Sequence, residues 1–271
     1  MVALMLLIYQ LEKQSYIEVR NMPNLGLGYG LAKSGMPVAS HVTDNLKMLH
    51  RYNTGSVVPV SDGAFYFFDS SINFGTGVTH NYSSGDTAHT YSFWALRETS
   101  PIASWEAIMS KQGVSGWSWI IFNSDPSAPK LYYESNTNGD SARADIPNMD
   151  TRWNHYAVTA NSGTVEMYQN GVKLATTDNS ISDDHTIDCL GDNGSGSNYF
   201  KGYLCNVGIW ERVLTQPEIK DIMFKNYAGL TSTNKTSLLH WWNLDEETNT
   251  SGESGTGGVK DSHGTNHGTL A

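Results

Sequence analysis

From about residue 64 onward, the chain is a succession of short apolar or alternating runs separated by turn-forming clusters. These runs recur at roughly the 8–12-residue interval expected of a β-sandwich. They are AFYFF, TYSFWAL, EAIMSKQ, GWSWIIFN, KLYYES, ARADIP, HYAVTA, TVEMYQ, VKLATT, HTIDCLG and KGYLCNVGIW. The clusters between them include TGVTHNYSSGD, NSDPSAP and SNTNGD. We therefore predict an all-β fold with many short strands.

The clearest local signal is the hairpin sequence TVEMYQ-Asn170-Gly171-VKLATT. Asn-Gly tolerates the two positive φ angles of a type I′ turn, and alternating runs flank it. In TYSFWAL, the alternation places Tyr91, Phe93 and Ala95 on one face of a strand and Trp94 on the other.

A single helix is predicted late in the chain. Thr215 and Glu218 fit a capping box, and Ile219 and Ile222 begin an apolar stripe. Gly229 is where we expect this helix to end.

Composition narrows the classes of partner. The chain has 271 residues, of which 39% are hydrophobic and 16% charged, so it can bury a sizeable core and is too apolar for a disordered chain. Its formal net charge is −10. An acidic surface repels phosphate backbones and anionic lipids, so we expect neither nucleic-acid binding nor membrane insertion.

The two cysteines, Cys189 and Cys205, show no CxxC spacing that would suggest zinc. Each lies in a strand-like run, and neighbouring antiparallel strands would bring them within bonding distance. A disulfide and a pair of buried free thiols both remain open, because the spacing of the two Cα atoms decides between them.

The chain divides into three predicted parts. Residues 1–42 form an N-terminal arm, in which a start at Met22 would make 1–21 an extension of the true protein. Residues 43–230 form the sandwich. Residues 231–271 are a tail with a Gly/Ser-rich link, and they are either a closing strand of the same sandwich or the stub of a second repeat. We favour the closing strand, because so short a tail cannot form another sandwich.

The order of the runs resembles the laminin-G-like jelly roll of the concanavalin A-like lectin/glucanase superfamily. The segment WNHYAVT (153–159), the Asn170-Gly171 hairpin and residues 200–219 carry this resemblance, which spans about residues 43–229. It implies a two-sheet antiparallel jelly-roll sandwich with one short C-terminal helix. The segments KSGMPV, DSHG-NHG and LTQ-EI are similar to those of such domains in marine phage virion proteins.

Catalytic patterns are missing from the sequence. There is no E-x-D-x-x-E run of the superfamily's hydrolases, no G-x-S-x-G and no H-E-x-x-H. Glu134 and Glu166 are isolated and are expected on a solvated face. His155 is expected to be a satisfied strand histidine, and His263 and His267 lie in a Gly-rich loop that would not stack them. We therefore predict no enzyme activity.

Binding residues are predicted on loops at the rim of the sandwich. The segment GDNGSGSNY (191–199) offers a carboxylate, amides and an aromatic ring through Asp192, Asn193, Asn198 and Tyr199. Such groups suit sugars, whose C–H faces stack on aromatic rings and whose hydroxyls bond to polar side chains.

Trp105 is a further candidate for stacking on a sugar, and Asp140 lies in a second polar loop. In pentraxins, which share the order of the runs, the loop that matches 191–199 supplies acidic calcium ligands. Asp192 and Asn193 partly match it, whereas residues 114–116, where the second set of ligands would fall, hold no carboxylate. A double calcium site is therefore not expected. One Ca²⁺ at Asp192 and Asn193 stays an open alternative, and no other cofactor is expected.

Two classes of function follow. The first is a non-catalytic, lectin-like module that binds a glycan or host-surface receptor as part of a phage virion appendage such as a tail fibre, spike or capsid decoration. The alternative is a structural sandwich that binds other virion proteins, or an extracellular bacterial adhesin module. In each case we expect a virion or extracellular location, and a homo-oligomer would suit a fibre.

Overall fold

The computed structural model describes residues 58–80, 88–98, 105–111, 119–123, 129–135, 140–147, 151–177, 181, 184–193, 198–245 and 258–270. All of them lie in the second of the two units into which the chain divides, Tyr52–Ala271. The arm predicted for residues 1–42 lies outside the described residues.

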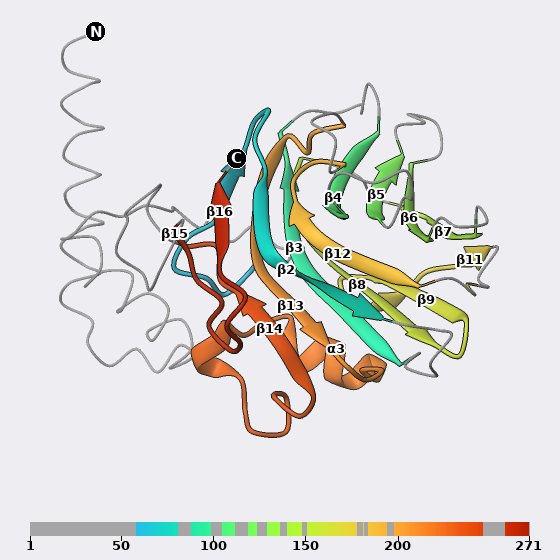
Figure 1. Ribbon diagram of the computed structural model, residues 1–271. Coiled ribbons are helices and arrows are strands. Elements are labelled where there is room, and N and C mark those ends of the chain that lie inside the picture. Colours follow the sequence, from blue (N-terminus) through green and yellow to red (C-terminus); the bar gives the residue numbers. More distant parts are fainter. Residues whose placement is uncertain are drawn as a thin grey trace, which may run out of the picture. The chain divides into compact units, whose positions relative to one another are not determined.

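Two antiparallel sheets form the sandwich (Figure 1). The first, sheet A, has the strand order β1 (Phe65–Phe67), β13 (Gly202–Trp210), β3 (His89–Arg97), β8 (Trp153–Asn161), β9 (Thr164–Gln169) and β10 (Val172–Lys173). Strand β14 (Leu238–Trp242) also pairs with β13, alongside the half that β1 leaves free.

The second sheet, sheet B, has nine strands in the order β11 (Thr176–Thr177), β7 (Asp140–Asp145), β6 (Lys130–Ser135), β5 (Trp119–Asn123), β4 (Glu106–Ser110), β12 (His185–Leu190), β2 (Ile72–His80), β16 (Gly268–Leu270) and β15 (Gly258–Val259). With the short helix α3 (Gln216–Ile222), this architecture confirms the predicted all-β jelly-roll sandwich.

The main core lies between the sheets and is built by alternation along the strands. In β3, Tyr91, Phe93 and Ala95 are buried in this core, whereas Trp94 belongs to a separate cluster on the opposite face. The alternation predicted for TYSFWAL is thus confirmed. Strand β2 places Ile72, Phe74 and Val78 of its nine residues in the same core.

Strand β2 corrects the sequence analysis, which placed TGVTH in a turn cluster. Those residues are the second half of β2, which pairs with β12 on one side and β16 on the other. Glycine, threonine and asparagine dilute the local strand signal here. Pairing of residues 78–80 with β12, which lies far away in the sequence, nevertheless holds the segment extended.

The Asn170-Gly171 hairpin is confirmed. Asn170 has φ 51° and Gly171 has φ 71°, and Val172 pairs with Gln169 across the turn. The run VKLATT that follows does not form one strand, however. Its first two residues are β10 of sheet A and its last two are β11 of sheet B, so the chain crosses between the sheets at the buried Leu174.

Helix α3 begins as predicted and ends earlier than predicted. Glu218 Oε2 accepts a hydrogen bond of 2.8 Å from the backbone N–H of Thr215, so the acidic half of the capping box is formed. The helix ends at Ile222, and Gly229 closes a separate 3₁₀ turn, η2 (Tyr227–Gly229), whose N-terminus is capped by Asn226. Within the described residues, no helix has the length and apolar character needed to cross a membrane.

The tail adds strands to both sheets, and Asp261 holds its turns together. This buried carboxylate accepts hydrogen bonds of 2.9–3.1 Å from the backbone N–H groups of Trp241, His263, Gly264 and Asn266. Its Oδ2 lies 2.6 Å from Nδ1 of His240. Burial alone would raise the pKa of Asp261, but the bonds from His240 and the backbone outweigh it and hold that pKa at about 2.

The two cysteines are buried free thiols in opposite sheets. Cys189 lies in β12 of sheet B and Cys205 in β13 of sheet A, so they are not on neighbouring strands. Burial raises the pKa of both thiols well above the usual range.

Candidate functional site

The outer faces of the two sheets differ in what covers them. Helix α3 and the loop after it pack on the outer face of sheet A, on the side away from β4–β7 (Figure 1). The cluster that they form comprises Ala157, Tyr168, Trp210, Leu214, Ile219, Ile222, Leu230, Leu238 and Trp241. The outer face of sheet B carries a smaller apolar cluster of Ala107, Trp119, Ile121 and Tyr132.

Trp105 stands at the margin of this smaller cluster, one residue before β4. Its side chain is 36% exposed, and its ring meets that of Tyr132 edge to face with the centroids 5.1 Å apart. This arrangement holds the indole in place while leaving part of it open to solvent. Trp105, which the sequence suggested as a stacking residue, is therefore partly exposed, and its ring packs against that of Tyr132.

Asn198 and Tyr199 join the same margin. The backbone N–H of Ala107 donates a 2.8 Å hydrogen bond to the carbonyl of Asn198, and Ala107 forms an isolated parallel bridge with Tyr199. Trp105 and the segment 198–199, which are distant in the sequence, thus both lie at the start of β4. We call Trp105, Tyr132, Asn198 and Tyr199 the rim site.

Charged groups lie beside the rim site on the outer face of sheet B. Tyr132 pairs with Arg143 across β6 and β7, and Trp119 pairs with Glu134 across β5 and β6. The Glu134 carboxylate accepts a hydrogen bond from Nε1 of Trp119. Burial raises the pKa of Glu134, and the bond from Trp119 and the charge of Arg143 oppose that rise only in part.

Sequence reasoning did not select Tyr132, Glu134 or Arg143 as site residues. The signal available for the first two was the alternation in KLYYES, which places both on one face of a strand. Glu134 had been expected on a solvated face, whereas it is half-buried beside Trp119.

Asp192 points inward, in the segment next to the rim site, where Gly191 hydrogen-bonds to the backbone of Ile108 and Phe200. Asp192 is only 3% exposed, and its Oδ1 accepts a 3.1 Å hydrogen bond from the thiol of Cys189. Asn193 follows it in a half-buried position, and residues 194–197 of the same loop lie outside the described residues. In the part of the chain that is described, no group of three or more His, Cys, Asp or Glu side chains could hold a metal ion.

Asp140 is not joined to either of these groups by any described contact. It is the first residue of β7 and pairs with Ser135 across the β6–β7 ladder, and its side chain lies outside the described part.

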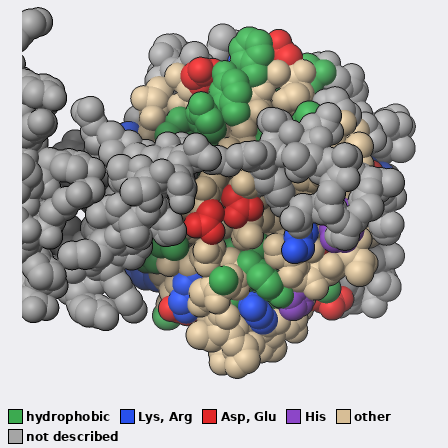
Figure 2. Space-filling model, turned by 90° about the vertical axis from the view of Figure 1, so that its left-hand side faces the viewer, with side chains coloured by type: hydrophobic (Ala, Val, Ile, Leu, Met, Phe, Trp, Pro, Cys, Tyr) green, Lys and Arg blue, Asp and Glu red, His purple; other side chains and the backbone are tan. Residues whose placement is uncertain are grey.

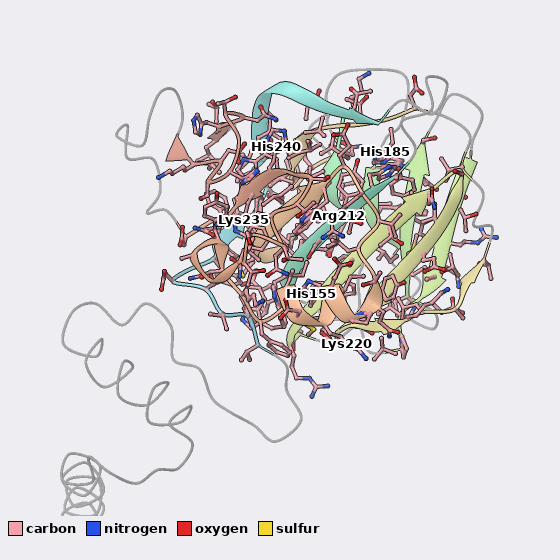
Figure 3. All side chains as sticks on the ribbon, turned by 90° about the horizontal axis from the view of Figure 1, so that it is seen from below. His155, His185, Arg212, Lys220, Lys235 and His240 are labelled. Atoms are coloured by element: carbon pink, nitrogen blue, oxygen red, sulfur yellow. The ribbon has the colours of Figure 1, made fainter. Side chains whose placement is uncertain are left out.

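Three strand histidines, His89, His155 and His185, are buried. His155 is buried with its Nε2 2.8 Å from Oγ of Ser92, and burial lowers its pKa to about 3, which keeps the ring neutral. His155, His185 and His240 lie in separate parts of the sandwich (Figure 3). Glu166 accepts a hydrogen bond from the Tyr168 hydroxyl and pairs with Lys173, contacts that lower its pKa.

Comparisons with solved structures place these surfaces on a known type of fold. The chain is similar to a protein from Bacteroides ovatus to which carbohydrate binding has been ascribed, with 21% identity, a TM-score of 0.54 and coverage of 76% of this chain. This chain spans 57% of the length of that protein. At 21% identity the likeness shows the fold alone.

Two further likenesses are weaker. Domain 4 of the extracellular arabinanase AbnA from Geobacillus stearothermophilus, solved with arabinotriose, gives 18% identity and a TM-score of 0.43, covering 64% of this chain and 84% of that one. A CBM40 domain of the Ruminococcus gnavus IT-sialidase, bound to α2,3-sialyllactose, gives 14% identity and a TM-score of 0.40. This likeness covers 60% of this chain and 99% of that one. Both TM-scores are too low to support an argument about this chain.

None of the curated proteins compared with this chain matches it. A family model does match, over residues 70–220, and its description is the concanavalin A-like lectin/glucanases superfamily. This stretch contains most strands of both sheets together with the start of α3. Because the match covers more than half of the 271 residues, the chain belongs to the concanavalin A-like lectin/glucanases superfamily.

Proposed function

We propose that this chain is a non-catalytic, lectin-like module that binds glycans through the rim site. The observation that carries the proposal is the exposed indole of Trp105, fixed edge to face on Tyr132 and set beside Asn198 and Tyr199. An aromatic face suits the C–H surface of a sugar ring, and nearby amide, hydroxyl and charged groups suit its hydroxyls. Membership of the superfamily and the fold shared with the Bacteroides ovatus protein support this class of ligand.

The biological setting that we propose is a phage virion appendage, such as a tail fibre, spike or capsid decoration, that attaches to host-surface glycans. The segments KSGMPV, DSHG-NHG and LTQ-EI, which are similar to those of phage virion proteins, support this setting. The formal net charge of −10 also favours glycan over nucleic acid as the partner.

The test is binding of the intact protein to a glycan array, repeated with Trp105→Ala. We expect the apparent Kd for the bound glycans to rise about tenfold or more, since anchoring aromatic side chains carry much of the binding energy. Phe224→Ala, which removes an exposed aromatic ring elsewhere on the surface, is the matched control and should bind as the wild type does.

Three results would overturn the proposal. Equal glycan binding by wild type and Trp105→Ala would show that the rim site is not where glycans bind. Binding only to other particle proteins would favour an assembly role instead. Release of reducing sugar from a broad polysaccharide panel would show catalysis.

Calcium enters as a separate proposal for the loop 191–199, with Asp192 and Asn193 as ligands. A cation that binds only the folded protein raises its Tm by mass action. We propose that Ca²⁺ raises the Tm relative to EDTA and that Asp192→Asn abolishes this rise. A wild-type Tm that is the same in Ca²⁺ and in EDTA would contradict the calcium proposal and favour a calcium-independent lectin.

A further inference from the structure

A row of three aromatic side chains and one leucine runs across sheet A, on the opposite layer of the sandwich from the rim site. Tyr66 of β1 pairs with Tyr203 of β13, Tyr203 pairs with Leu96 of β3, and Leu96 pairs with Trp153 of β8. All four side chains lie on the outer face, because they alternate with residues of the main core. Since neighbouring strands lie about 4.8 Å apart, the row is about 14 Å long.

The end of this row at β1 is open to solvent. Tyr66 is 39% exposed and Tyr203 is 37% exposed, and their ring centroids are 4.8 Å apart. Phe68, directly after β1, stacks on Tyr66 with the ring centroids 6.4 Å apart, and 56% of its surface is exposed. We call Tyr66, Phe68, Leu96, Trp153 and Tyr203 the aromatic strip.

The aromatic strip borders the part of sheet A that α3 covers. Met223, directly after the helix, packs with Trp94 and Cys205, and Trp153 packs against this cluster from the strip. Among the described residues, the apolar cluster formed by α3 and its loop does not extend to Tyr66, Phe68 or Tyr203. At the β1 end, the exposed rings of Tyr66, Phe68 and Tyr203 adjoin one another, and contiguous exposed apolar surface marks binding sites.

Polar groups flank the aromatic rings. The Tyr66 hydroxyl donates a 2.6 Å hydrogen bond to Oε2 of Glu98. Nζ of Lys201 lies 5.4 Å from the centroid of the Phe68 ring and 3.8 Å from Oδ1 of Asp69. The strip therefore combines flat apolar faces with two carboxylates, one ammonium group and tyrosine hydroxyls, a mixture that suits a ligand with C–H faces and hydroxyl edges.

We infer that the aromatic strip is a second binding surface, which takes an extended, neutral glycan chain. The ligand is extended because the three exposed rings of Tyr66, Phe68 and Tyr203 offer more stacking surface than a single sugar ring can cover. It is neutral because two carboxylates beside one ammonium group, on a chain with a net charge of −10, repel acidic polysaccharides. Carboxylates also lie next to hydrophobic side chains on the face drawn in Figure 2.

This inference rests on the proposed function for the class of ligand, but it uses different residues from the rim site. The experiment is a pull-down and titration of the full chain with microcrystalline cellulose, soluble neutral glucan and mannan, and polygalacturonate. It compares wild type with Tyr203→Ala, with the double variant Phe68→Ala/Tyr203→Ala and with Trp105→Ala. Val172→Ala, which trims an apolar side chain exposed at the far edge of sheet A, is the matched control.

We expect binding to at least one neutral polysaccharide, little binding to polygalacturonate, and a fall in affinity of about tenfold in Tyr203→Ala and more in the double variant. The Tm of both variants should stay within a degree or two of wild type, which separates lost binding from lost folding. Loss of binding in Trp105→Ala alone would support the rim site and overturn the strip.

Two other outcomes would also overturn the inference. If wild type binds none of the neutral polysaccharides, the strip does not take this class of ligand. If the wild type instead self-associates in a concentration-dependent way and the double variant stays monomeric, the strip is a protein interface.

Discussion

Two parts of the outer face of sheet A are built from the same strands and end in opposite environments. On β13, Trp210 is fully buried under the α3 segment and its Nε1 donates a 2.7 Å hydrogen bond to the carbonyl of Asn234. Seven residues earlier on the same strand, Tyr203 is 37% exposed in the aromatic strip. The two side chains share the outer face because the register of β13 against β3 shifts between Cys205 and Gly208, which offsets the odd separation of the two residues in the sequence. Only a covering segment decides whether that face becomes core or binding surface.

The strongest test of this comparison is truncation of one aromatic residue on each side. Trp210→Ala should lower the free energy of unfolding by about 3–5 kcal/mol, because it leaves a cavity beneath the α3 segment and an unpaired carbonyl at Asn234. Tyr203→Ala should lower it by less than about 1 kcal/mol. Urea unfolding followed by tryptophan fluorescence and circular dichroism measures both. Equal losses in the two variants would show that the strip is part of the core.

A second test uses pH, because the covered part contains the buried His155. Its pKa is lowered to about 3 by burial, from a usual value of 6.5. Between pH 6.5 and 3, His155 therefore binds a proton in the unfolded chain but not in the folded protein. The resulting stability is fully present above pH 6.5 and is lost as the pH falls towards 3.

By pH 4.5 the free energy of unfolding should have fallen by about 2–3 kcal/mol because of His155. Urea unfolding between pH 7.5 and 4.5 measures the slope, which His155→Asn should flatten and His263→Asn, at an exposed position, should leave in place. A wild type whose stability does not change over this range would contradict the assignment of His155 as a neutral buried ring.

A third test concerns the link between the tail and the covered part. Asp261 accepts a hydrogen bond from the backbone of Trp241, whose side chain belongs to the α3 cluster. Asp261→Asn should lower the free energy of unfolding by about 2 kcal/mol, because asparagine keeps a single, uncharged acceptor oxygen where both carboxylate oxygens now accept hydrogen bonds. Asp145→Asn, at an exposed carboxylate, is the control. An unchanged Cm in Asp261→Asn would show that the tail does not stabilise the covered part.

Local signals in the sequence were enough for several elements. The Asn170-Gly171 turn, the alternation in β3 and the start of α3 all depend on residues within a few positions of one another. The end of α3 depends on a competing cap at Asn226, which a search for a terminal glycine does not reveal. Strand β2 was missed because its extended conformation comes from its partners β12 and β16.

For the candidate site, the sequence indicated several of the residues but not how they are arranged in space. Trp105, Asn198 and Tyr199 could be selected by chemical type, because loops rich in aromatic and amide groups suit sugars. That they meet at Ala107 follows from a bridge between segments distant in the sequence, which no local pattern encodes. The inward direction of Asp192 depends in the same way on the thiol of Cys189 beside it.

The order in which the strands of sheet B leave the ribosome has a consequence of its own. Strand β2, near the start of the sandwich, lies between β12 and β16, and β16 is its last described strand. During synthesis at about 5–20 residues per second, one edge of β2 therefore waits on the order of ten seconds or more for its partner. Over that time the nascent chain exposes an unpaired strand edge with the side chains of Ile72, Phe74 and Val78, so we expect aggregation during synthesis to begin at β2.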